Sequence, residues 1–214
     1  MLLDVCLGAR ERTEDWLDLG HGLIARGLRS PLLVVSDGAP GLVRAITELW
    51  PDADRGRCAV HRLRNILAKL PKRPGLHARV RAAYWAALDG ATSPQQAELG
   101  LRVLVGELSR EYPSAAACLA DDLPALTVHL AYPLRLKKRL RSTNLLERSL
   151  EEVRRRTKVI GRFPGETSCL TMAWAVMDLV IAGSRGLGLT RPERHGIAGL
   201  VAARSVPQTE ERIA

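Results

Sequence analysis

The first third of the chain alternates between short apolar runs and stretches in which apolar side chains recur every three or four positions. Short runs are typical of buried strands, and the wider spacing is typical of helices that pack on them. The clearest strand is Pro31-Leu32-Leu33-Val34-Val35, which ends in the turn residues Ser36-Asp37-Gly38. The pattern predicts strands over residues 2–7, 31–35 and 57–60, and helices over residues 13–26, 40–50 and 61–70.

A long helical region follows from residue 75 to residue 130. It is interrupted where proline starts a new helix, at Ser93-Pro94, Tyr112-Pro113 and Leu123-Pro124. Another helix is expected to begin at about Asn144, and one more to cover residues 166–181. The tail from residue 184 has weak periodicity and is expected to be flexible.

Length and composition fit an ordered globular chain. The 214 residues are enough for one substantial core and leave room for an inserted subdomain. The longest apolar stretch, residues 169–183, contains Asp178 and is shorter than the roughly 20 residues that cross a bilayer, so no membrane span is predicted. No basic region precedes the apolar N-terminal residues, as it would in a secretory signal. The cysteines form no C-x-x-C pair, which indicates reduced thiols in a cytosolic protein.

Positive charge is concentrated in one segment. The chain has 32 Lys and Arg against 23 Asp and Glu, a net charge of +9. Nearly all of this excess lies between Arg135 and Arg162, and it predicts a polyanionic partner, with DNA backbone as the first choice. A solvated helix face is the alternative for this segment. The candidate DNA-binding residues are Arg141, Arg148, Arg154, Arg155, Arg156 and Lys158.

Two carboxylates in this basic setting are candidates for metal-dependent phosphoryl chemistry. Asp37 follows a strand, and Glu147 falls in the first turn of a helix. Acidic side chains at such places can hold the Mg²⁺ ions that activate a hydroxyl nucleophile. Each residue also has a structural interpretation, because Asp37 could simply form an Asp-Gly turn and Asn144-x-x-Glu147 fits a capping box.

Cys58 and His61 have the spacing of half a zinc site, which His129 or His195 could extend. No second pair occurs at a matching spacing. A small buried cysteine and a histidine at a helix start is therefore the default interpretation.

Taken together, these motifs resemble the mutator-type transposases of bacterial insertion sequences. Residues 33–42, Trp50-Pro51 and residues 57–72 are similar to the central signature of that family, and Arg141-Ser142-Thr143-Asn144-Leu145-Leu146-Glu147 and residues 153–161 are similar to its second signature. The resemblance implies an α/β fold, an incomplete ribonuclease H-like core interrupted by an all-helical insertion. It implies a first part of the core at residues 1–74, the insertion at 75–140, helices with the third carboxylate at 141–183, and a tail at 184–214.

The resemblance also implies a reaction. Asp37 would be the second and Glu147 the third carboxylate of a DDE triad, both as ligands of Mg²⁺ or Mn²⁺, and Cys58 and His61 would match a family signature near the site. The partners would be double-stranded DNA, as insertion-sequence ends and target, and a second copy or a full-length transposase. The location would be cytoplasmic, at the nucleoid.

The first carboxylate of the triad has no counterpart in this sequence, because Asp4 matches a later strand of the family. The chain is therefore expected to be the C-terminal part of a catalytic domain, an N-terminally truncated copy that is inactive alone. The alternatives are a non-catalytic DNA-binding remnant and a purely helical interaction protein.

Overall fold

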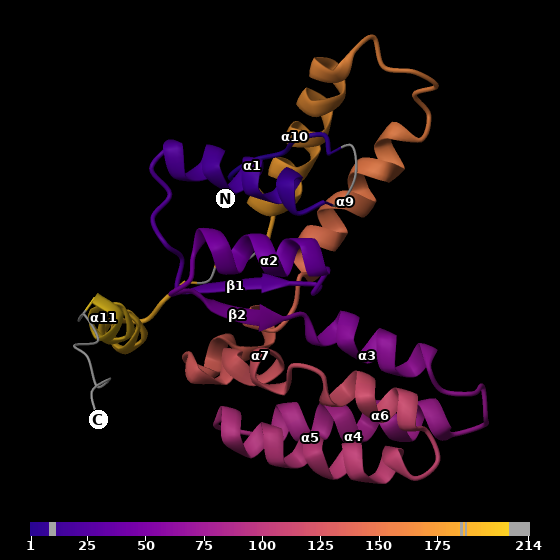
Figure 1. Ribbon diagram of the computed structural model, residues 1–214. Helices are drawn as coiled ribbons and strands as arrows, with labels where there is room; N and C mark the ends of the chain where they lie inside the picture. The colour runs from indigo at the N-terminus through magenta and orange to yellow at the C-terminus, as the bar shows by residue number, and fades with distance from the viewer. Residues whose placement is uncertain (9–11, 185, 187, 206–214) are drawn as a thin grey trace.

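The computed structural model describes residues 1–8, 12–184, 186 and 188–205. Most of these residues are helical, and a two-stranded parallel sheet lies among the helices (Figure 1). The structure is thus a mixed α/β arrangement. Within the described residues, no helix is both long enough and apolar enough to span a membrane.

The sheet is formed by β1 (Leu33–Ser36) and β2 (Asp54–Arg57), with Leu33 opposite Asp54 and Ser36 opposite Arg57. Helix α2 (Pro40–Leu49) connects the two strands, with proline in its first turn. Helix α1 (Thr13–Ala25) packs on α2 (Figure 1). The two helices approach closely at Gly20, where an added Cβ would lie 2.1 Å from Leu49 Cδ1.

A helical bundle packs against the other side of the sheet region (Figure 1). It contains α3 (Ala59–Ala68), α4 (Leu76–Gly90), α5 (Pro94–Ser109), α6 (Pro113–Ala120) and α7 (Leu123–Thr127). The predicted proline breaks are confirmed, since α5, α6 and α7 each have proline in the first turn. The bundle holds the main apolar core, in which the Tyr84 hydroxyl donates to the Ala59 carbonyl at 2.9 Å. Burial raises the pKa of Tyr84.

One arginine joins helices within this bundle, and another connects the bundle to the sheet. The side chain of Arg62 on α3 is only 3% exposed, and it bonds the Cys118 carbonyl at 2.6 Å and the Asp121 carboxylate at 2.9 Å. Arg55 of β2 pairs with Asp122, which precedes α7. A buried guanidinium is costly without its partners, so the Arg62 bonds hold α3 against the end of α6. The partly exposed Arg55–Asp122 pair is the one that links the bundle to β2.

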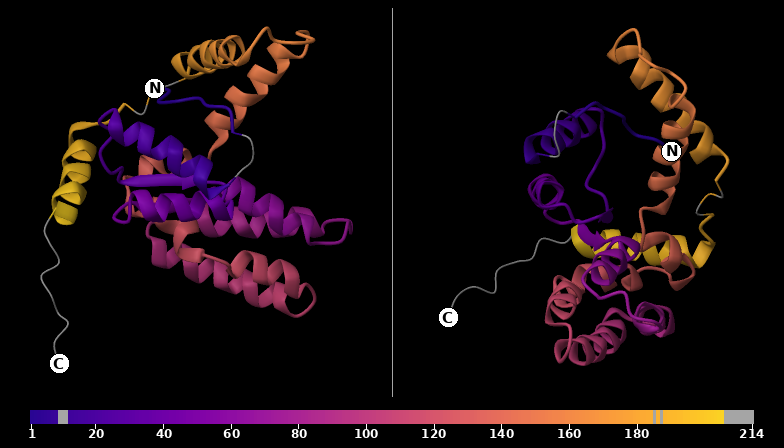
Figure 2. Two further views of the ribbon diagram at one scale, coloured as in Figure 1. Left: turned by 45° about the horizontal axis from the view of Figure 1, so that its top comes forward. Right: turned by 90° about the vertical axis from the view of Figure 1, so that its right-hand side faces the viewer.

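Short helical turns, η1 (Val128–Ala131), η2 (Leu134–Leu136) and α8 (Lys137–Leu140), lead from the bundle to two long helices. These helices, α9 (Asn144–Thr157) and α10 (Glu166–Ala182), pack on each other and project away from the bundle (Figure 2). Few of their side chains are buried, among them Ser149, Val176 and Met177.

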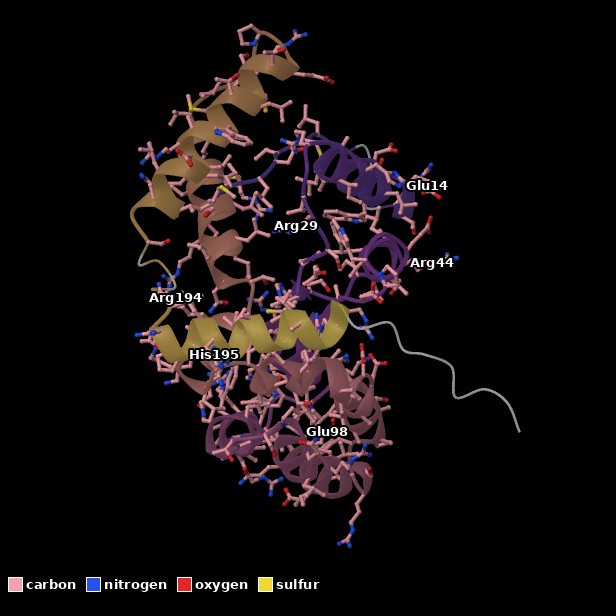
Figure 3. The ribbon with its side chains drawn as sticks, turned by 90° about the vertical axis from the view of Figure 1, so that its left-hand side faces the viewer. Glu14, Arg29, Arg44, Glu98, Arg194 and His195 are labelled. Atoms are coloured by element: carbon pink, nitrogen blue, oxygen red, sulfur yellow. The ribbon has the colours of Figure 1, made fainter. Side chains whose placement is uncertain are left out.

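The tail contains a helix that the sequence analysis missed. Helix α11 (Arg191–Ser205) lies across the side of the molecule shown in Figure 3. Arg204 at its end pairs with Asp54 of β2 at 2.6 Å and donates to the Leu32 carbonyl at 2.7 Å. Tyr132 joins this contact by donating to Asp54 at 2.7 Å, and burial together with that bond raises the pKa of Tyr132 to about 12. Charged side chains therefore dock the tail helix, which explains why apolar periodicity did not reveal it.

Two predicted strands are wrong. Residues 2–7 form no strand, and the Leu3 carbonyl and Asp4 carboxylate are instead bonded by the side chain of Arg26. The strand expected at 57–60 lies earlier, at Asp54–Arg57, and α3 already begins at Ala59. The polar residues of β2 have little strand propensity, and they become a strand by pairing with β1.

We predict that His129 makes stability depend on pH. His129 in η1 is buried and its Nδ1 bonds the Leu126 carbonyl at 3.1 Å; burial, followed by the charge of Arg141, lowers its pKa to about 4. The pKa of histidine in an unfolded chain is about 6.5. Between pH ~4 and pH ~6.5 the unfolded state therefore binds a proton at His129 that the folded state does not. The free energy of unfolding should be unaffected by His129 above pH ~6.5 and should fall by on the order of 2–3 kcal/mol towards pH ~4.

Chemical denaturation between pH 4 and pH 7 measures this effect. His129→Gln should flatten the curve relative to the parent chain, whereas His21→Gln, a change at an exposed position, should not. Parallel curves for the parent and His129→Gln would contradict the prediction.

Candidate metal and DNA site

Three segments that are distant in the sequence meet at Cys58, which precedes α3. Its backbone N–H donates to the Ser36 carbonyl at the end of β1 at 2.7 Å. The next N–H, that of Ala59, donates to the Arg141 carbonyl at 2.8 Å. The end of β1, the start of α3 and the segment before α9 are thereby joined at one point.

Asp37 lies immediately after β1 in a tight turn. Its Oδ1 accepts from the Ala39 N–H at 3.0 Å, as the structural interpretation of the Asp-Gly pair predicts. Gly38 has φ +86°, and its carbonyl accepts from Arg57 Nη1 at 3.0 Å. Burial lowers the pKa of Arg57, and the Asp37 carboxylate is one of the charges that oppose this shift. Asp37 is exposed, and Oδ2 lies outside the turn bond.

Glu147 lies in the first turn of α9, but not in the capping box that the sequence suggested. Thr143, and not Asn144, is the N-cap residue, and it makes no side-chain capping bond. The Thr143 hydroxyl donates to Glu147 Oε1 at 3.1 Å instead. His61 Nδ1 lies 3.6 Å from Oε1, and Arg64 Nη2 lies 3.6 Å from Oε2. The carboxylate therefore faces α3, with its two oxygens in different surroundings.

Cys58 and His61 complete a cluster around the same threonine. The Cys58 side chain is fully buried, and its Sγ lies 3.5 Å from the Thr143 N–H nitrogen and 3.4 Å from the Thr143 hydroxyl. Ligand atoms of Cys58, His61 and Glu147 all lie within 4.8 Å of one another. Among the described residues this is the one group of three or more His, Cys, Asp or Glu side chains with that geometry, and Asp37 is not a member.

The cluster also bears on the candidate zinc ligands. Glu147 joins Cys58 and His61, whereas neither His129 nor His195 belongs to the group. His129 is buried against Leu126, and His195 lies on α11 (Figure 3). Sequence reasoning missed Thr143, although its position four residues before Glu147 on one helical face was a usable signal.

The candidate DNA-binding residues fall into two groups. The Arg141 guanidinium stacks over Trp85 at 4.4 Å, pairs with Asp89 at 2.6 Å and is only 11% exposed, so it is engaged within the protein. The others are exposed residues on or just after α9: Arg148, Arg154, Arg155, Arg156 and Lys158.

Two of these exposed arginines have a partner on their own helix. Arg155 and Arg156 each approach Glu152 within 2.7 Å. Their hydrogen bonds lower the pKa of Glu152 to about 2. Glu152 therefore remains a carboxylate and offsets part of the positive charge on this face.

Comparison with known proteins identifies the family. Residues 1–180 match the family model described as "Transposase, Mutator family". The chain belongs to the mutator family of transposases. The match includes the sheet, the helical bundle and most of the α9–α10 pair, and α11 follows it.

Individual transposases of insertion sequence elements are similar to most of the chain. The transposase of insertion sequence element ISRM5 from Rhizobium meliloti is 37% identical over 175 residues, which is 82% of this chain and 43% of the relative. The transposase of IS6120 from Mycolicibacterium smegmatis is 33% identical over 189 residues, 87% of this chain and 57% of the relative. The transposase of IST2 from Acidithiobacillus ferrooxidans is 33% identical over 197 residues, which is 90% of this chain and 64% of the relative. The chain thus spans about half the length of these curated relatives.

We predict that a side chain at Gly38 strains the turn that carries Asp37 and displaces the Arg57 guanidinium. A Cβ at Gly38 would lie 1.3 Å from Arg57 Nη1, and the positive φ adds strain of about 1 kcal/mol. Gly38→Ala should therefore destabilise the chain more than Gly27→Ala, since Gly27 also has a positive φ but no atom within 4 Å of an added Cβ. Urea denaturation measures the difference.

The double variant Gly38→Ala/Arg57→Ala tests the cause. Removal of the guanidinium should reduce the cost of Gly38→Ala to that of Gly27→Ala. Equal costs for Gly38→Ala with and without Arg57 would contradict the steric explanation.

Proposed function

We propose that this chain carries two carboxylates of a DDE transposase site, Asp37 and Glu147, for metal-dependent cleavage and transfer of DNA strands. The single observation that carries the proposal is the junction at Cys58. Its N–H bonds the residue before Asp37, and its Sγ contacts the residue that orients Glu147. The segments that carry these two carboxylates, 110 positions apart in the sequence, are thereby bonded to the same residue.

The fold around them supports a ribonuclease H-like core. The β1-α2-β2 unit is parallel, with one helix as crossover, and α9 returns to the carboxyl end of β1 through the Cys58 junction. The helices of residues 75–140, which pack with α3 in one bundle, would be the all-helical insertion between the second and third carboxylates. Residues 1–74 and 141–183 would then be the two parts of the core.

The donor atoms suit Mg²⁺ or Mn²⁺ at Asp37 Oδ2 and at Glu147, because these ions prefer oxygen ligands. When bound, such ions lower the pKa of water or hydroxyl nucleophiles and stabilise the leaving oxygen. The protein's own part is orientation. Thr143 holds one Glu147 oxygen, and the Ala39 N–H holds one Asp37 oxygen.

DNA would lie along the exposed basic face of α9. Arg148 and Arg154 on α9 and Lys158 just after it are exposed to solvent. Arg155 and Arg156 are also exposed, although Glu152 offsets part of their charge. Arginine contacts to phosphate give binding that is independent of sequence. The partners would be insertion-sequence ends, target DNA, and a second copy or a longer transposase, at the nucleoid in the cytoplasm.

A non-catalytic DNA-binding form is the second candidate. In the described residues no group of three carboxylates has ligand atoms within 4.8 Å of one another. Two ions held for in-line displacement need more ligands than Asp37 and Glu147 supply. The chain alone would then bind DNA without cutting it.

We predict that DNA binding by this chain weakens steeply with salt. The slope of log K against log salt should be about −0.9 for each neutralised phosphate. Replacing Arg154, Arg155 and Arg156 together by Ala should make the slope shallower by at most ~2.7, and by less to the extent that Glu152 already neutralises two of them. Fluorescence anisotropy with a duplex at several salt concentrations measures this.

A matched triple variant controls for net charge. It replaces three exposed arginines outside the basic segment with Ala: Arg44, Arg102 and Arg110. Its slope should match that of the parent chain. An equal change in both variants would show that DNA does not follow α9.

We further predict that the purified 214-residue chain neither cuts nor joins DNA with Mg²⁺ or Mn²⁺, because two carboxylates are too few to fix both ions. A strand-transfer assay with labelled duplex measures this. Metal-dependent strand transfer that disappears in Asp37→Ala or Glu147→Ala would refute the prediction and point to a further carboxylate in this chain.

A further inference from the structure

Four side-chain donor atoms lie close together where α3 and α9 begin: Cys58 Sγ, His61 Nδ1, Thr143 Oγ1 and Glu147 Oε1. The Thr143 hydroxyl lies 3.4 Å from Cys58 Sγ, 3.5 Å from His61 Nδ1 and 3.1 Å from Glu147 Oε1. His61 Nδ1 lies 3.6 Å from Glu147 Oε1. A ring nitrogen of His61 and a carboxylate oxygen of Glu147 also lie within 4.8 Å of Cys58 Sγ.

Four of the six separations approach those of a tetrahedral zinc site, and the two from the sulfur to His61 and Glu147 are at most 4.8 Å. Zinc binds sulfur at about 2.3 Å, and nitrogen and oxygen at about 2.0–2.2 Å. Neighbouring ligands of a tetrahedron with those radii are about 3.3–3.7 Å apart. The contacts of 3.4, 3.5 and 3.6 Å lie in this range, and the hydrogen-bonded oxygens at 3.1 Å need to separate only slightly.

We propose that Cys58, His61 and Glu147 bind Zn²⁺, with the Thr143 hydroxyl, or a water that replaces it, as the fourth ligand. One sulfur, one nitrogen and one carboxylate are a donor set for zinc, whereas Mg²⁺ takes oxygen ligands. Three protein ligands and one exchangeable oxygen are the pattern of open zinc sites. On binding, the Cys58 thiol releases its proton to solvent and the sulfur forms the bond to zinc.

The surroundings of the ligands favour this role. Cys58 is fixed by its backbone bond to Ser36, and the Thr143 N–H points at its sulfur, as outer hydrogen bonds do at metal-bound thiolates. The sulfur is buried, but the side chains of His61 and Glu147 are 23% and 29% exposed. An ion can therefore reach the cluster from solvent through these two ligands.

The site has a consequence for transposition that rests on the proposed function. Glu147 is both a zinc ligand here and the proposed third carboxylate. Zinc on Oε1 would hold this carboxylate towards α3 and reduce its availability to Mg²⁺. Zinc would then be an inhibitor of the metal-dependent reaction.

Cobalt substitution tests the site without DNA or Mg²⁺. The reduced, metal-free chain is titrated with Co²⁺, which in a tetrahedral site with a thiolate gives visible bands and a near-ultraviolet sulfur-to-cobalt band. We expect both bands to saturate at one Co²⁺ per chain and to disappear when one equivalent of Zn²⁺ is added. Absence of the sulfur-to-cobalt band at excess Co²⁺ would overturn the proposal and leave a hydrogen-bonded cluster only.

Variants assign the ligands. Cys58→Ser should abolish the sulfur-to-cobalt band, and His61→Ala and Glu147→Gln should each weaken Zn²⁺ binding at least about tenfold. The matched controls change the same residue types outside the cluster and should bind like the parent chain: Cys169→Ser, His21→Ala and Glu151→Gln. Circular dichroism of each variant identifies loss of folding.

The two proposals can fail separately. The cobalt spectrum of the parent chain decides the zinc site whether or not the chain acts in transposition. Unaltered Zn²⁺ affinity in Glu147→Gln, with the sulfur band retained, would remove Glu147 from the zinc site and leave its proposed role towards Mg²⁺ untouched.

Discussion

The arrangement of the candidate site depends on one buried residue, Cys58. Its N–H and that of Ala59 satisfy carbonyls from β1 and from the segment before α9. Buried backbone groups need such partners, so the junction cannot open without leaving unpaired donors and acceptors. The sulfur, fully buried, receives the Thr143 contacts. The same side chain therefore sets the distance between α3 and α9 and the direction of Glu147.

Ion pairs play a corresponding part within the bundle and between the bundle and the sheet. Arg62 is enclosed by the bundle and reaches Asp121, and Arg55 reaches Asp122. Loss of Asp121 would leave the buried Arg62 guanidinium without its charge partner, so this contact fixes α3 relative to α6. The Arg55–Asp122 pair is partly exposed and links β2 to the residue before α7. The bundle separates Asp37 and Glu147 in sequence, and its attachment to the strands keeps their segments together.

The sequence was sufficient where local patterns decide the structure. Val34 and Val35 favour a strand by their own propensity, and proline marks the starts of α5 and α6. It was insufficient where tertiary contacts decide. The polar Asp54–Arg57 segment becomes a strand through its pairing with β1, and α11 is docked by Arg204. The same limit applied to the site, since no local pattern indicates that Arg141 would stack on Trp85.

The two proposals for Glu147 require different metal chemistry from one carboxylate. A carboxylate that serves Mg²⁺ needs free oxygens and a fixed direction. Thr143 supplies the direction by bonding Oε1, while Oε2 lies towards Arg64, whose side chain is 62% exposed and therefore free to move. A thiol and an imidazole beside Oε1 are ligands for softer ions than Mg²⁺. Under the two proposals, Zn²⁺ and Mg²⁺ would compete for the same carboxylate, and Oε1, which lies beside His61 and accepts from Thr143, is the oxygen that Zn²⁺ would take.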